Sequence, residues 1–312
     1  MNALCGESSL GTGYTYALGE IVFDNFKAER IRANGVDIQV NWAGNGPPLL
    51  LLHGYPESHL MWHRVAPELA EHFTVVVPDL RGYGDSYKPA SAPDHLPYSK
   101  RVTAQDQAEV MTALGFQEFF VAGHDRGGRV AHRLTLDHAA RVKKLAVLDI
   151  APTLKVFETV NQRVATSYFH WFFLIQPFDF PERMIGRDPR DYLLSRMTSW
   201  GSKQDAFPQT VLDEYVRCFS DPACIHATCE DYRAAASIDL EHDRADLHKR
   251  ISCPLLVLWG GRGLVGAAYD PIAVWQERAN DVRGHAIDSG HFIPEEKPQE
   301  TINALRTFFL GK

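Results

Sequence analysis

The sharpest chemical signal in the chain is a glycine-flanked segment around one aspartate. It reads Gly123-His124-Asp125-Arg126-Gly127-Gly128 and directly follows an apolar run. Glycines two residues before and after a central residue permit a tight, strained turn that exposes the central side chain. This G-x-Nu-x-G pattern is the nucleophile elbow, with Asp125 where a serine commonly stands. The dipole of a following helix also favours the carboxylate, so we predict that Asp125 is a nucleophile.

An aspartate nucleophile restricts the bonds that can be attacked. A serine that displaces a group from an sp3 carbon leaves an ether, which water does not readily cleave. An aspartate leaves an ester, and an activated water can hydrolyse that ester at the carbonyl carbon of the enzyme's own side chain. Asp125 therefore indicates alkyl halides or epoxides, rather than carboxylic esters, as substrates.

Two arginines stand beside this aspartate. Arg126 follows it directly, and Arg129 lies three residues further on, so both can share one face of the first helical turn. Guanidinium groups bind carboxylates through forked, charge-assisted hydrogen bonds. The pair therefore predicts a substrate that carries a carboxylate, bound by Arg126 and Arg129.

The apolar pattern predicts the elements that must position these residues. Continuous apolar runs that end in Gly, Asp or His are typical of parallel strands buried on both faces. Such runs lie at 49–54, 74–80, 119–125, 144–150 and 254–260. Helical patterns lie at 58–72, 99–114, 127–137 and 298–310. This alternation indicates a mostly parallel, doubly wound α/β sheet, with an edge hairpin that turns at Asn34-Gly35.

The alternation stops after Ile150. The segment that follows is rich in aromatic residues and helical patterns, and no strand pattern returns for a long stretch. We therefore expect a helical lid, or cap, over 151–245, inserted into a core formed by 21–150 and 246–312. Residues 1–20 lack a basic region followed by an apolar run, so we expect a flexible tail and not a signal peptide.

Composition limits the expected partners. The chain has 312 residues, with 32 Lys and Arg against 39 Asp and Glu, a formal charge of −7. Nucleic-acid binders show a basic stripe and binders of anionic membranes carry basic clusters, so neither partner is expected. No apolar run approaches the about 20 residues of a membrane-spanning helix. The five cysteines are too scattered for a disulfide framework, which favours a cytoplasmic protein.

Three further segments carry family motifs. They are His53-Gly54-Tyr55-Pro56, Asp79–Ser86 and, near the C-terminus, Asp288–Phe292. Together with the elbow they make the chain resemble the α/β-hydrolase family, from Phe26 to the C-terminus. The resemblance implies the α/β-hydrolase fold and a histidine, His291, that activates the hydrolytic water.

The same resemblance implies an oxyanion hole and an acid that orients the histidine. The backbone N–H groups of Tyr55 and Arg126 would hold the oxyanion that forms on the nucleophile. In many relatives the acid follows the last of the predicted core strands, but here Gly263 lies near that position. We therefore predict that Asp149, at the other recognised place, orients the histidine, with Asp270 as the alternative.

Two segments of the expected lid carry hydrogen-bond donors. Tyr168-Phe169-His170-Trp171 and Glu230–Ala236 resemble segments of the fluoroacetate and haloacetate dehalogenases. Matching position by position implies that His170, Trp171 and Tyr232 hold the halide. Imidazole N–H, indole N–H and phenol O–H are all donors, and three of them would stabilise a leaving fluoride as its charge develops.

These features favour a hydrolytic dehalogenase of haloacetates. Fluoroacetate or chloroacetate would become glycolate and free halide through an aspartyl ester. The expected partner is a small haloacid, and the resemblance implies no metal and no organic cofactor. Similar enzymes are commonly homodimers, so a homodimer is also expected.

An epoxide hydrolase is the main alternative. Tyr168 and Tyr232 fall near the positions where two lid tyrosines of that enzyme class donate to the epoxide oxygen. The arginine pair, the His170-Trp171 dipeptide and the missing acid near Gly263 disfavour it. A catalytically silent α/β-hydrolase that binds a small acid or a partner is a further alternative, which the complete set of candidate catalytic residues disfavours.

Overall fold

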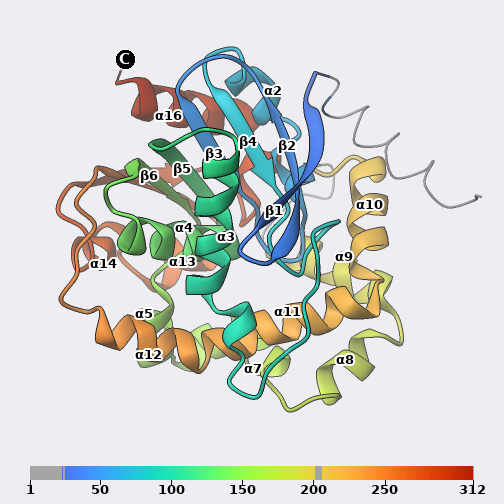
Figure 1. Cartoon of the computed structure of the whole chain (residues 1–312). Helices are drawn as coiled ribbons and strands as arrows, with labels where there is room; N and C mark the ends of the chain where they lie inside the picture. The colour runs from blue at the N-terminus through green and yellow to red at the C-terminus, as the bar shows by residue number, and fades with distance from the viewer. Residues whose placement is uncertain (1–22, 24, 201–205, 312) are drawn as a thin grey trace, which may run out of the picture.

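The structure is a computed structural model that describes residues 23, 25–200 and 206–311. The expected tail, 1–20, lies outside these residues. A single eight-stranded sheet runs through the molecule in the order β1-β2-β4-β3-β5-β6-β7-β8 (Figure 1). The strands are β1 (Lys27–Ala33), β2 (Val36–Ala43), β3 (Pro48–Leu52), β4 (Thr74–Pro78), β5 (Phe119–His124), β6 (Val142–Leu148), β7 (Leu255–Gly260) and β8 (Val282–Ile287).

The sheet is mostly parallel, as predicted. β1 pairs antiparallel with β2, and β2 pairs antiparallel with β4, while the pairs from β4 through β3 to β8 are parallel. The hairpin turns at Asn34 and Gly35, whose φ angles of 45° and 78° are those that a tight hairpin turn requires. The predicted core strands correspond to β3 through β7. The sequence pattern missed β8, because this edge strand is largely exposed and carries no continuous apolar run.

Most of the predicted core helices are present. They are α3 (Lys100–Ala113), α4 (Asp125–Asp137) and α16 (Pro298–Leu310), and α3 and α4 pack against each other. The prediction of a single helix over 58–72 is wrong, because that stretch holds a 3-10 turn, η1 (His59–Trp62), and a short helix, α2 (Ala66–Leu69). Pro67 explains the break, since proline inside a helix removes one N–H donor and clashes with the preceding turn.

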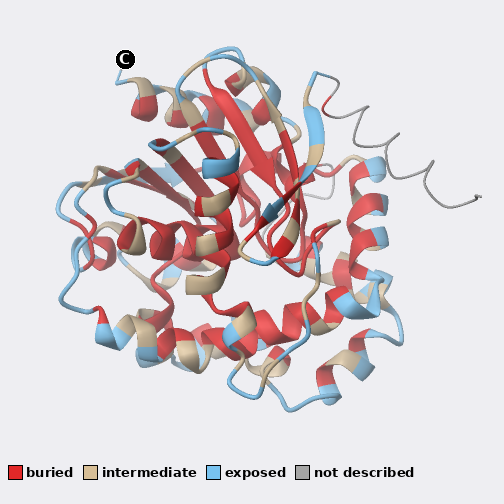
Figure 2. Ribbon diagram, in the orientation of Figure 1, coloured by how far each residue is buried: buried red, intermediate tan, exposed pale blue. Residues whose placement is uncertain are grey.

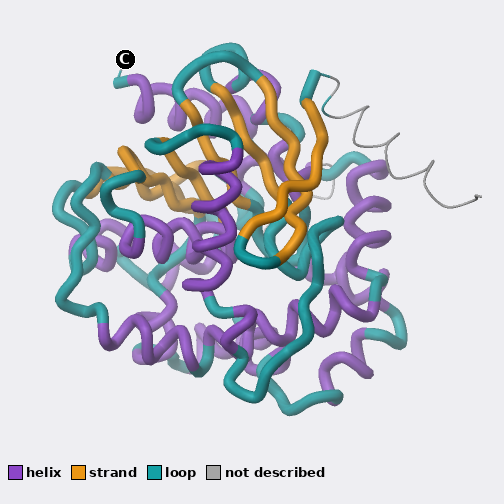
Figure 3. The backbone as a smooth tube through the Cα atoms, viewed as in Figure 1, coloured by secondary structure: helices purple, strands orange, loops and turns teal. Residues whose placement is uncertain are grey.

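A run of helices joins β6 to β7. They are α5 (Thr153–Glu158), α6 (Gln162–Ser167), α7 (Phe169–Leu174), α8 (Phe180–Ile185), α9 (Pro189–Ser199), α10 (Gln209–Phe219), α11 (Pro222–Ala235) and α12 (Ile238–Ala245). We call this segment, α5–α12, the inserted helices. Figures 1 and 3 show them gathered along one side of the sheet, with α11 running across it. The remaining short helices are η2 (Leu96–Tyr98), α13 (Leu264–Ala268), α14 (Pro271–Gln276) and α15 (Ile293–Glu296).

The core is centred on the middle strands of the sheet. All of β4 and nearly all of β3 are buried, and Figure 2 shows buried residues on the sheet and on the inner sides of the helices around it. In parallel sheets of this kind, ligands bind outside the carboxyl ends of the strands. Asp125 follows β5 directly, and Asp149 follows β6. Among the described residues, no helix combines the length and the apolar character needed to cross a membrane.

Candidate active site

The elbow around Asp125 has the strained geometry that its glycines predict. Asp125 has φ 44°, in the left-handed region, at the junction of β5 and α4. A Cβ added to Gly123 would lie 2.4 Å from the Gly127 carbonyl oxygen, and one added to Gly127 would lie 2.4 Å from the carbonyl oxygen of His53. Only glycine therefore fits at both positions. The backbone N–H of Tyr55 donates to Asp125 Oδ1 at 3.1 Å, so this predicted oxyanion donor already contacts the carboxylate.

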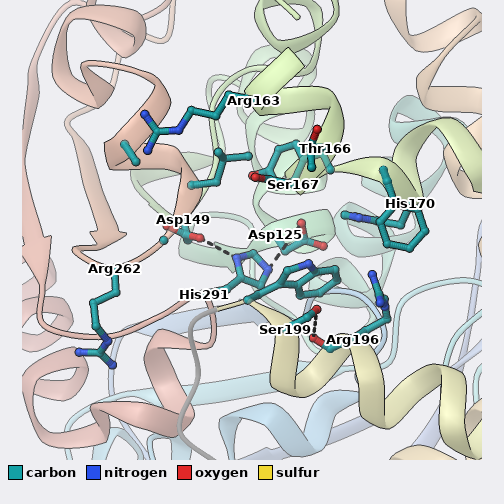
Figure 4. A pocket seen from close by; sticks show the side chains of 16 residues that line it. Asp125, Asp149, Arg163, Thr166, Ser167, His170, Arg196, Ser199, Arg262 and His291 are labelled. Atoms are coloured by element: carbon teal, nitrogen blue, oxygen red, sulfur yellow. Dashed lines mark hydrogen bonds and ion pairs between the residues drawn. The ribbon is translucent and has the colours of Figure 1, made fainter. Parts of the chain in front are cut away.

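The predicted histidine and acid meet the aspartate at one place (Figure 4). His291 Nε2 lies 3.9 Å from Asp125 Oδ2. The other ring nitrogen, Nδ1, donates to Asp149 Oδ2 at 2.6 Å, and Asp149 Oδ1 accepts the N–H of Gly260 at 3.0 Å. With Nδ1 held in this way, Nε2 is the nitrogen free to take a proton from water.

The geometry separates the two candidate acids. Asp270 caps the N-terminus of α14 by accepting the N–H of Ala273 at 3.1 Å, away from the histidine. Gly263 lies against Asp149, because a Cβ added there would be 3.4 Å from both carboxylate oxygens. The space next to Gly263, where an acid stands in many relatives, is thus filled by Asp149 from the neighbouring strand.

Neighbouring charges set the protonation states of Asp125 and His291. Burial opposes ionisation of Asp125, but the charges of His291 and Arg129 outweigh it and lower the pKa of the carboxyl group. Burial likewise opposes charging of His291, but the hydrogen bond and charge of Asp149 outweigh it and raise the pKa of the imidazole. Asp125 is therefore an ionised carboxylate at neutral pH, as an attacking group must be.

Both predicted arginines are buried beside Asp125, but they have different partners. Arg126 Nε and Nη2 donate to the side chain and the backbone carbonyl of Asp231, at 2.6 Å and 2.8 Å. Arg129 Nη1 donates to the carbonyl of Ala151 at 2.8 Å and to the hydroxyl of Thr153 at 3.0 Å. Arg126 Nη1, Arg129 Nε and Arg129 Nη2 are buried without a hydrogen-bond partner in the described part of the chain.

The three predicted halide donors gather around these arginines. The Arg126 guanidinium carbon lies 4.1 Å from the centre of the Tyr232 ring, and that of Arg129 lies 4.5 Å from the Trp171 ring. The His170 and Tyr232 ring centres are 5.6 Å apart. The Tyr232 hydroxyl and His170 Nδ1 are also buried with no partner among the described residues.

Burial fixes the charge of two of these donors. It raises the pKa of Tyr232 well above the usual range, so the phenol keeps its proton. It also lowers the pKa of His170 well below the usual range, so the imidazole is neutral. Buried polar groups are normally satisfied. A cluster of unsatisfied donors beside a carboxylate therefore indicates space for a ligand that accepts hydrogen bonds. We call these four residues, Arg126, Arg129, His170 and Tyr232, together with Trp171, whose ring lies against Arg129, the inner cradle.

An open cavity of about 440 Å³ lies next to the inner cradle (Figure 4). Asp125, His170 and His291 line it, together with residues of the inserted helices such as Tyr168 and Trp200. The other members of the inner cradle do not line it. Asp125 and His170 thus stand at the boundary between an open outer space and a closed inner one.

Sequence patterns missed several residues that shape the site. Asp231 holds Arg126, and it also accepts from Lys100 and from the Tyr83 hydroxyl. The Trp200 ring lies 5.2 Å from the His291 ring, centre to centre, and the Trp200 carbonyl accepts the His291 backbone N–H at 3.0 Å. The sequence offers one signal for Asp231, which is its place directly before Tyr232. Its burial could not be expected, because acidic residues on helices usually face solvent.

The described residues hold no group of three or more His, Cys, Asp and Glu side chains that could bind a metal ion.

Comparison with known proteins finds similar hydrolases. A fluoroacetate dehalogenase from Burkholderia sp is 46% identical over 92% of this chain and 95% of its own length. A soluble epoxide hydrolase from Corynebacterium sp. (strain C12) is 37% identical over 88% of this chain and 94% of its own length. A crystal structure from Nostoc sp PCC 7120, described as that of an α/β hydrolase, has a TM-score of 0.91 and 58% identity, covering 92% of this chain and 99% of the other.

The family model for the alpha/beta hydrolase fold matches residues 47–298. This match, the sheet order and the elbow agree, and the resemblance to haloacetate dehalogenases inferred from motifs is confirmed by the relative from Burkholderia. The chain belongs to the α/β-hydrolase family and is a hydrolase that resembles the haloacetate dehalogenases.

Proposed function

We propose that this hydrolase removes halide from haloacetates, fluoroacetate and chloroacetate included, through an ester on Asp125. The main support for this proposal is the set of polar atoms in the inner cradle that lack hydrogen-bond partners, next to the ionised carboxylate of Asp125. Buried guanidinium N–H groups without a partner are costly. A substrate carboxylate would satisfy those of Arg126 and Arg129, and a halide would accept from the neutral donors.

In the first step, one Asp125 oxygen attacks the α-carbon of the haloacid. The carbon–halogen bond breaks, the halide leaves with the bonding electrons, and a carboxymethyl ester of Asp125 remains. Arg126 and Arg129 hold the substrate carboxylate and offset its repulsion from the Asp125 carboxylate. His170, Trp171 and Tyr232 donate to the leaving halide, and their effect is greatest as charge develops on it.

In the second step, His291 takes a proton from water, and the resulting hydroxide attacks the carbonyl carbon of the ester. Backbone N–H groups of Tyr55 and Arg126 stabilise the oxyanion. The tetrahedral intermediate then collapses, and the departing glycolate oxygen takes the proton held by His291. Asp125 loses its remaining proton to water and returns to its ionised form. Asp149 keeps the imidazole in the correct tautomer and stabilises its charged form, as acids do in related catalytic triads.

An epoxide hydrolase remains the second candidate, for a specific reason. Tyr168 lines the cavity beside Asp125 and Tyr232 carries a free hydroxyl, so two tyrosines are near the nucleophile. The 37% identical relative supports this candidate. A neutral epoxide, however, leaves the free N–H groups of Arg126 and Arg129 unsatisfied, which disfavours it.

The deciding experiment compares two products of the purified protein. Halide release from fluoroacetate and chloroacetate is measured beside diol formation from styrene oxide. We expect halide release with glycolate in equal amount and little or no diol. Turnover of the epoxide alone would overturn the proposal. No turnover of either substrate would favour a silent hydrolase.

A further inference from the structure

The outer cavity carries positive charge that the proposed chemistry does not use. Arg163 on α6, Arg196 on α9 and Arg262 after β7 all line it. Among the described residues that line it, the acidic side chains are Asp125 and Asp149, and both contact His291. Figure 4 shows Arg163 and Arg196 on opposite sides of the Asp125–His291 pair.

Two of these arginines have no acidic partner. Arg262 is neutralised by ion pairs to Asp288 at 2.5 Å and Glu296 at 3.0 Å. Arg163 and Arg196, in contrast, form no ion pair with any carboxylate in the described part of the chain. Within the described residues, Arg196 makes hydrogen bonds of 3.4 Å to the Ser195 hydroxyl. Its guanidinium carbon lies 4.5 Å from the centre of the Phe169 ring and 5.8 Å from that of the Tyr192 ring.

The cavity is larger than the binding site of a two-carbon acid needs to be. Its volume of about 440 Å³ is many times the about 30 Å³ that one water occupies in the liquid. The inner cradle is closed, since its five members are each 3% exposed or less. A small acid bound there would leave the outer cavity to solvent, with two unpaired guanidinium groups facing it.

We propose that the outer cavity is a vestibule that binds small carboxylates before they reach the inner cradle, with Arg163 and Arg196 as its anion-binding groups. This inference rests on the proposed function for its biological meaning. Clefts lined by one sign of charge raise the local concentration of oppositely charged ligands. The chain as a whole carries −7, so a local cationic wall offsets the repulsion that an anionic substrate would otherwise meet.

The test uses charge-removing and charge-keeping variants of the full chain. Arg163→Gln, Arg196→Gln and the double variant are compared with the Lys double variant. Arg190→Gln is the matched control, because Arg190 lies on the same helix, α9, but pairs with Asp213 at the surface and does not line the cavity. Arg163→Gln carries the test alone if loss of the Arg196 contact to Phe169 destabilises α9.

We expect the Gln double variant to raise KM for chloroacetate about fivefold at low ionic strength, with kcat unchanged. The difference should shrink at about 0.5 M salt, where exposed charges are screened within a few ångströms. The Lys double variant and Arg190→Gln should behave as wild type. A Lys double variant as impaired as the Gln variant would show that charge is not the cause and would overturn the vestibule.

A binding measurement separates this inference from the proposed function. The affinity for acetate, measured by calorimetry, needs no turnover and should fall in the Gln double variant by the same factor as KM rises. Acetate binding that depends on both arginines, without halide release by wild type, would keep the vestibule and refute the dehalogenase. Halide release with unchanged KM, acetate affinity and salt dependence in the double variant would refute the vestibule alone.

Discussion

At the scale of single residues, the site is defined by which polar groups are satisfied and which are not. Arg126 is held at one edge by Asp231 and keeps one free nitrogen, Nη1, inside a closed space. Tyr232 and His170 are kept neutral by burial and have free polar atoms. A surface arginine or tyrosine is satisfied by water, so each hydrogen bond to an anion would contribute less there than it does for these buried groups.

Replacing His291 should separate the two chemical steps. In His291→Asn the attack by Asp125 needs no base, whereas hydrolysis of the ester does, so the ester should accumulate. We expect the intact protein to gain the mass of one carboxymethyl group on incubation with chloroacetate, located by peptide mapping at Asp125. Asp125→Asn is the control and should gain nothing. A burst of halide from His291→Asn without any gain in mass would contradict the ester mechanism.

The Asp231 carboxylate should act as a positioning residue for Arg126. Asp231→Asn removes the charge that fixes Arg126 Nε at 2.6 Å. We expect KM for chloroacetate to rise about tenfold, equivalent to about 1.4 kcal/mol, with a smaller change in kcat. Steady-state kinetics at several substrate concentrations give both parameters.

Asp239→Asn is the matched control for that variant. Asp239 lies 3.7 Å from the same lysine, Lys100, but makes no contact with Arg126. It should leave KM near the wild-type value. Equal losses in the two variants, or a fall in kcat alone for Asp231→Asn, would assign Asp231 to general stability and not to substrate binding.

At the scale of elements, the sheet decides where the orienting acid stands. Asp149 follows β6, while the position used in many relatives follows β7, near Gly263. The strands are neighbours in parallel register, so both loops end at the same edge of the sheet. The Asp149 carboxylate reaches His291 at 2.6 Å and also accepts the N–H of Gly260 from β7. Asp149 therefore links the end of β6 to the end of β7 and to the loop after β8 that carries His291.

Removing Asp149 should change both rate and pH dependence. We expect Asp149→Asn to slow ester hydrolysis by about 10³-fold or more, by analogy with triad aspartates. Asp149 raises the pKa of His291, and the proposed mechanism needs the neutral imidazole. The acidic limb of the pH–rate profile should therefore lie above the ordinary pKa of a free histidine in wild type and move to lower pH in Asp149→Asn. Single-turnover rates between pH 5 and pH 9 measure this.

The closeness of Gly263 to the Asp149 carboxylate also predicts a rescue. Asp149→Gly combined with Gly263→Asp moves the carboxylate to the neighbouring loop, into the space that the Asp149 side chain vacates. We expect this double variant to hydrolyse the ester faster than Asp149→Gly alone. Gly263→Asp in the presence of Asp149 should be inactive or unstable, because two carboxylates would then meet at one position. Absence of any rescue would mean that the β6 position is required for more than its charge.

At the scale of the whole molecule, one buried acid pair should govern stability against pH. Glu57, 2% exposed, and Glu295, 0% exposed, interact beneath the elbow, and Glu295 accepts from the Tyr215 hydroxyl at 2.8 Å. Burial raises the pKa of Glu57 to about 8, and burial together with the charge of Glu57 raises that of Glu295. The folded state therefore binds more protons than the unfolded state from about pH 5 to about pH 8.

This difference in bound protons sets the direction in which the free energy of unfolding changes with pH. Stability should fall as pH rises through that window, because the unfolded chain ionises while the folded pair resists. Glu295→Gln removes one titrating group and keeps an acceptor for Tyr215. We expect its free energy of unfolding at pH 8 to exceed that of wild type by at least about 1 kcal/mol, which appears as a higher Tm, and we expect little difference at pH 5. Thermal melts across pH 5 to 8.5 measure this, with the exposed Glu118→Gln as control. Parallel Tm profiles for all three proteins would contradict the assignment.

Local features of the chain were predictable from its sequence because they depend on neighbours along the chain. The Gly123 and Gly127 spacing predicts the elbow, since it dictates backbone angles within a few residues. Apolar runs predict β3 through β7, because strands buried on both faces need them. The exposed edge strand β8 and the break at Pro67 were missed or misjudged, because there the local pattern is weak or ambiguous.

Tertiary structure alone decided which side chains became partners. No local pattern encodes contacts this far apart along the chain. The pairing of His291 with Asp149, across 142 positions, was expected only through the family resemblance, and that of Arg126 with Asp231, across 105, was not expected at all. Only packing excludes water from Arg129 and Tyr232, which turns ordinary polar side chains into unsatisfied donors. The net charge of −7 could be read from composition, but the positive site within it arises because folding buries selected cations beside Asp125 and leaves most acids at the surface.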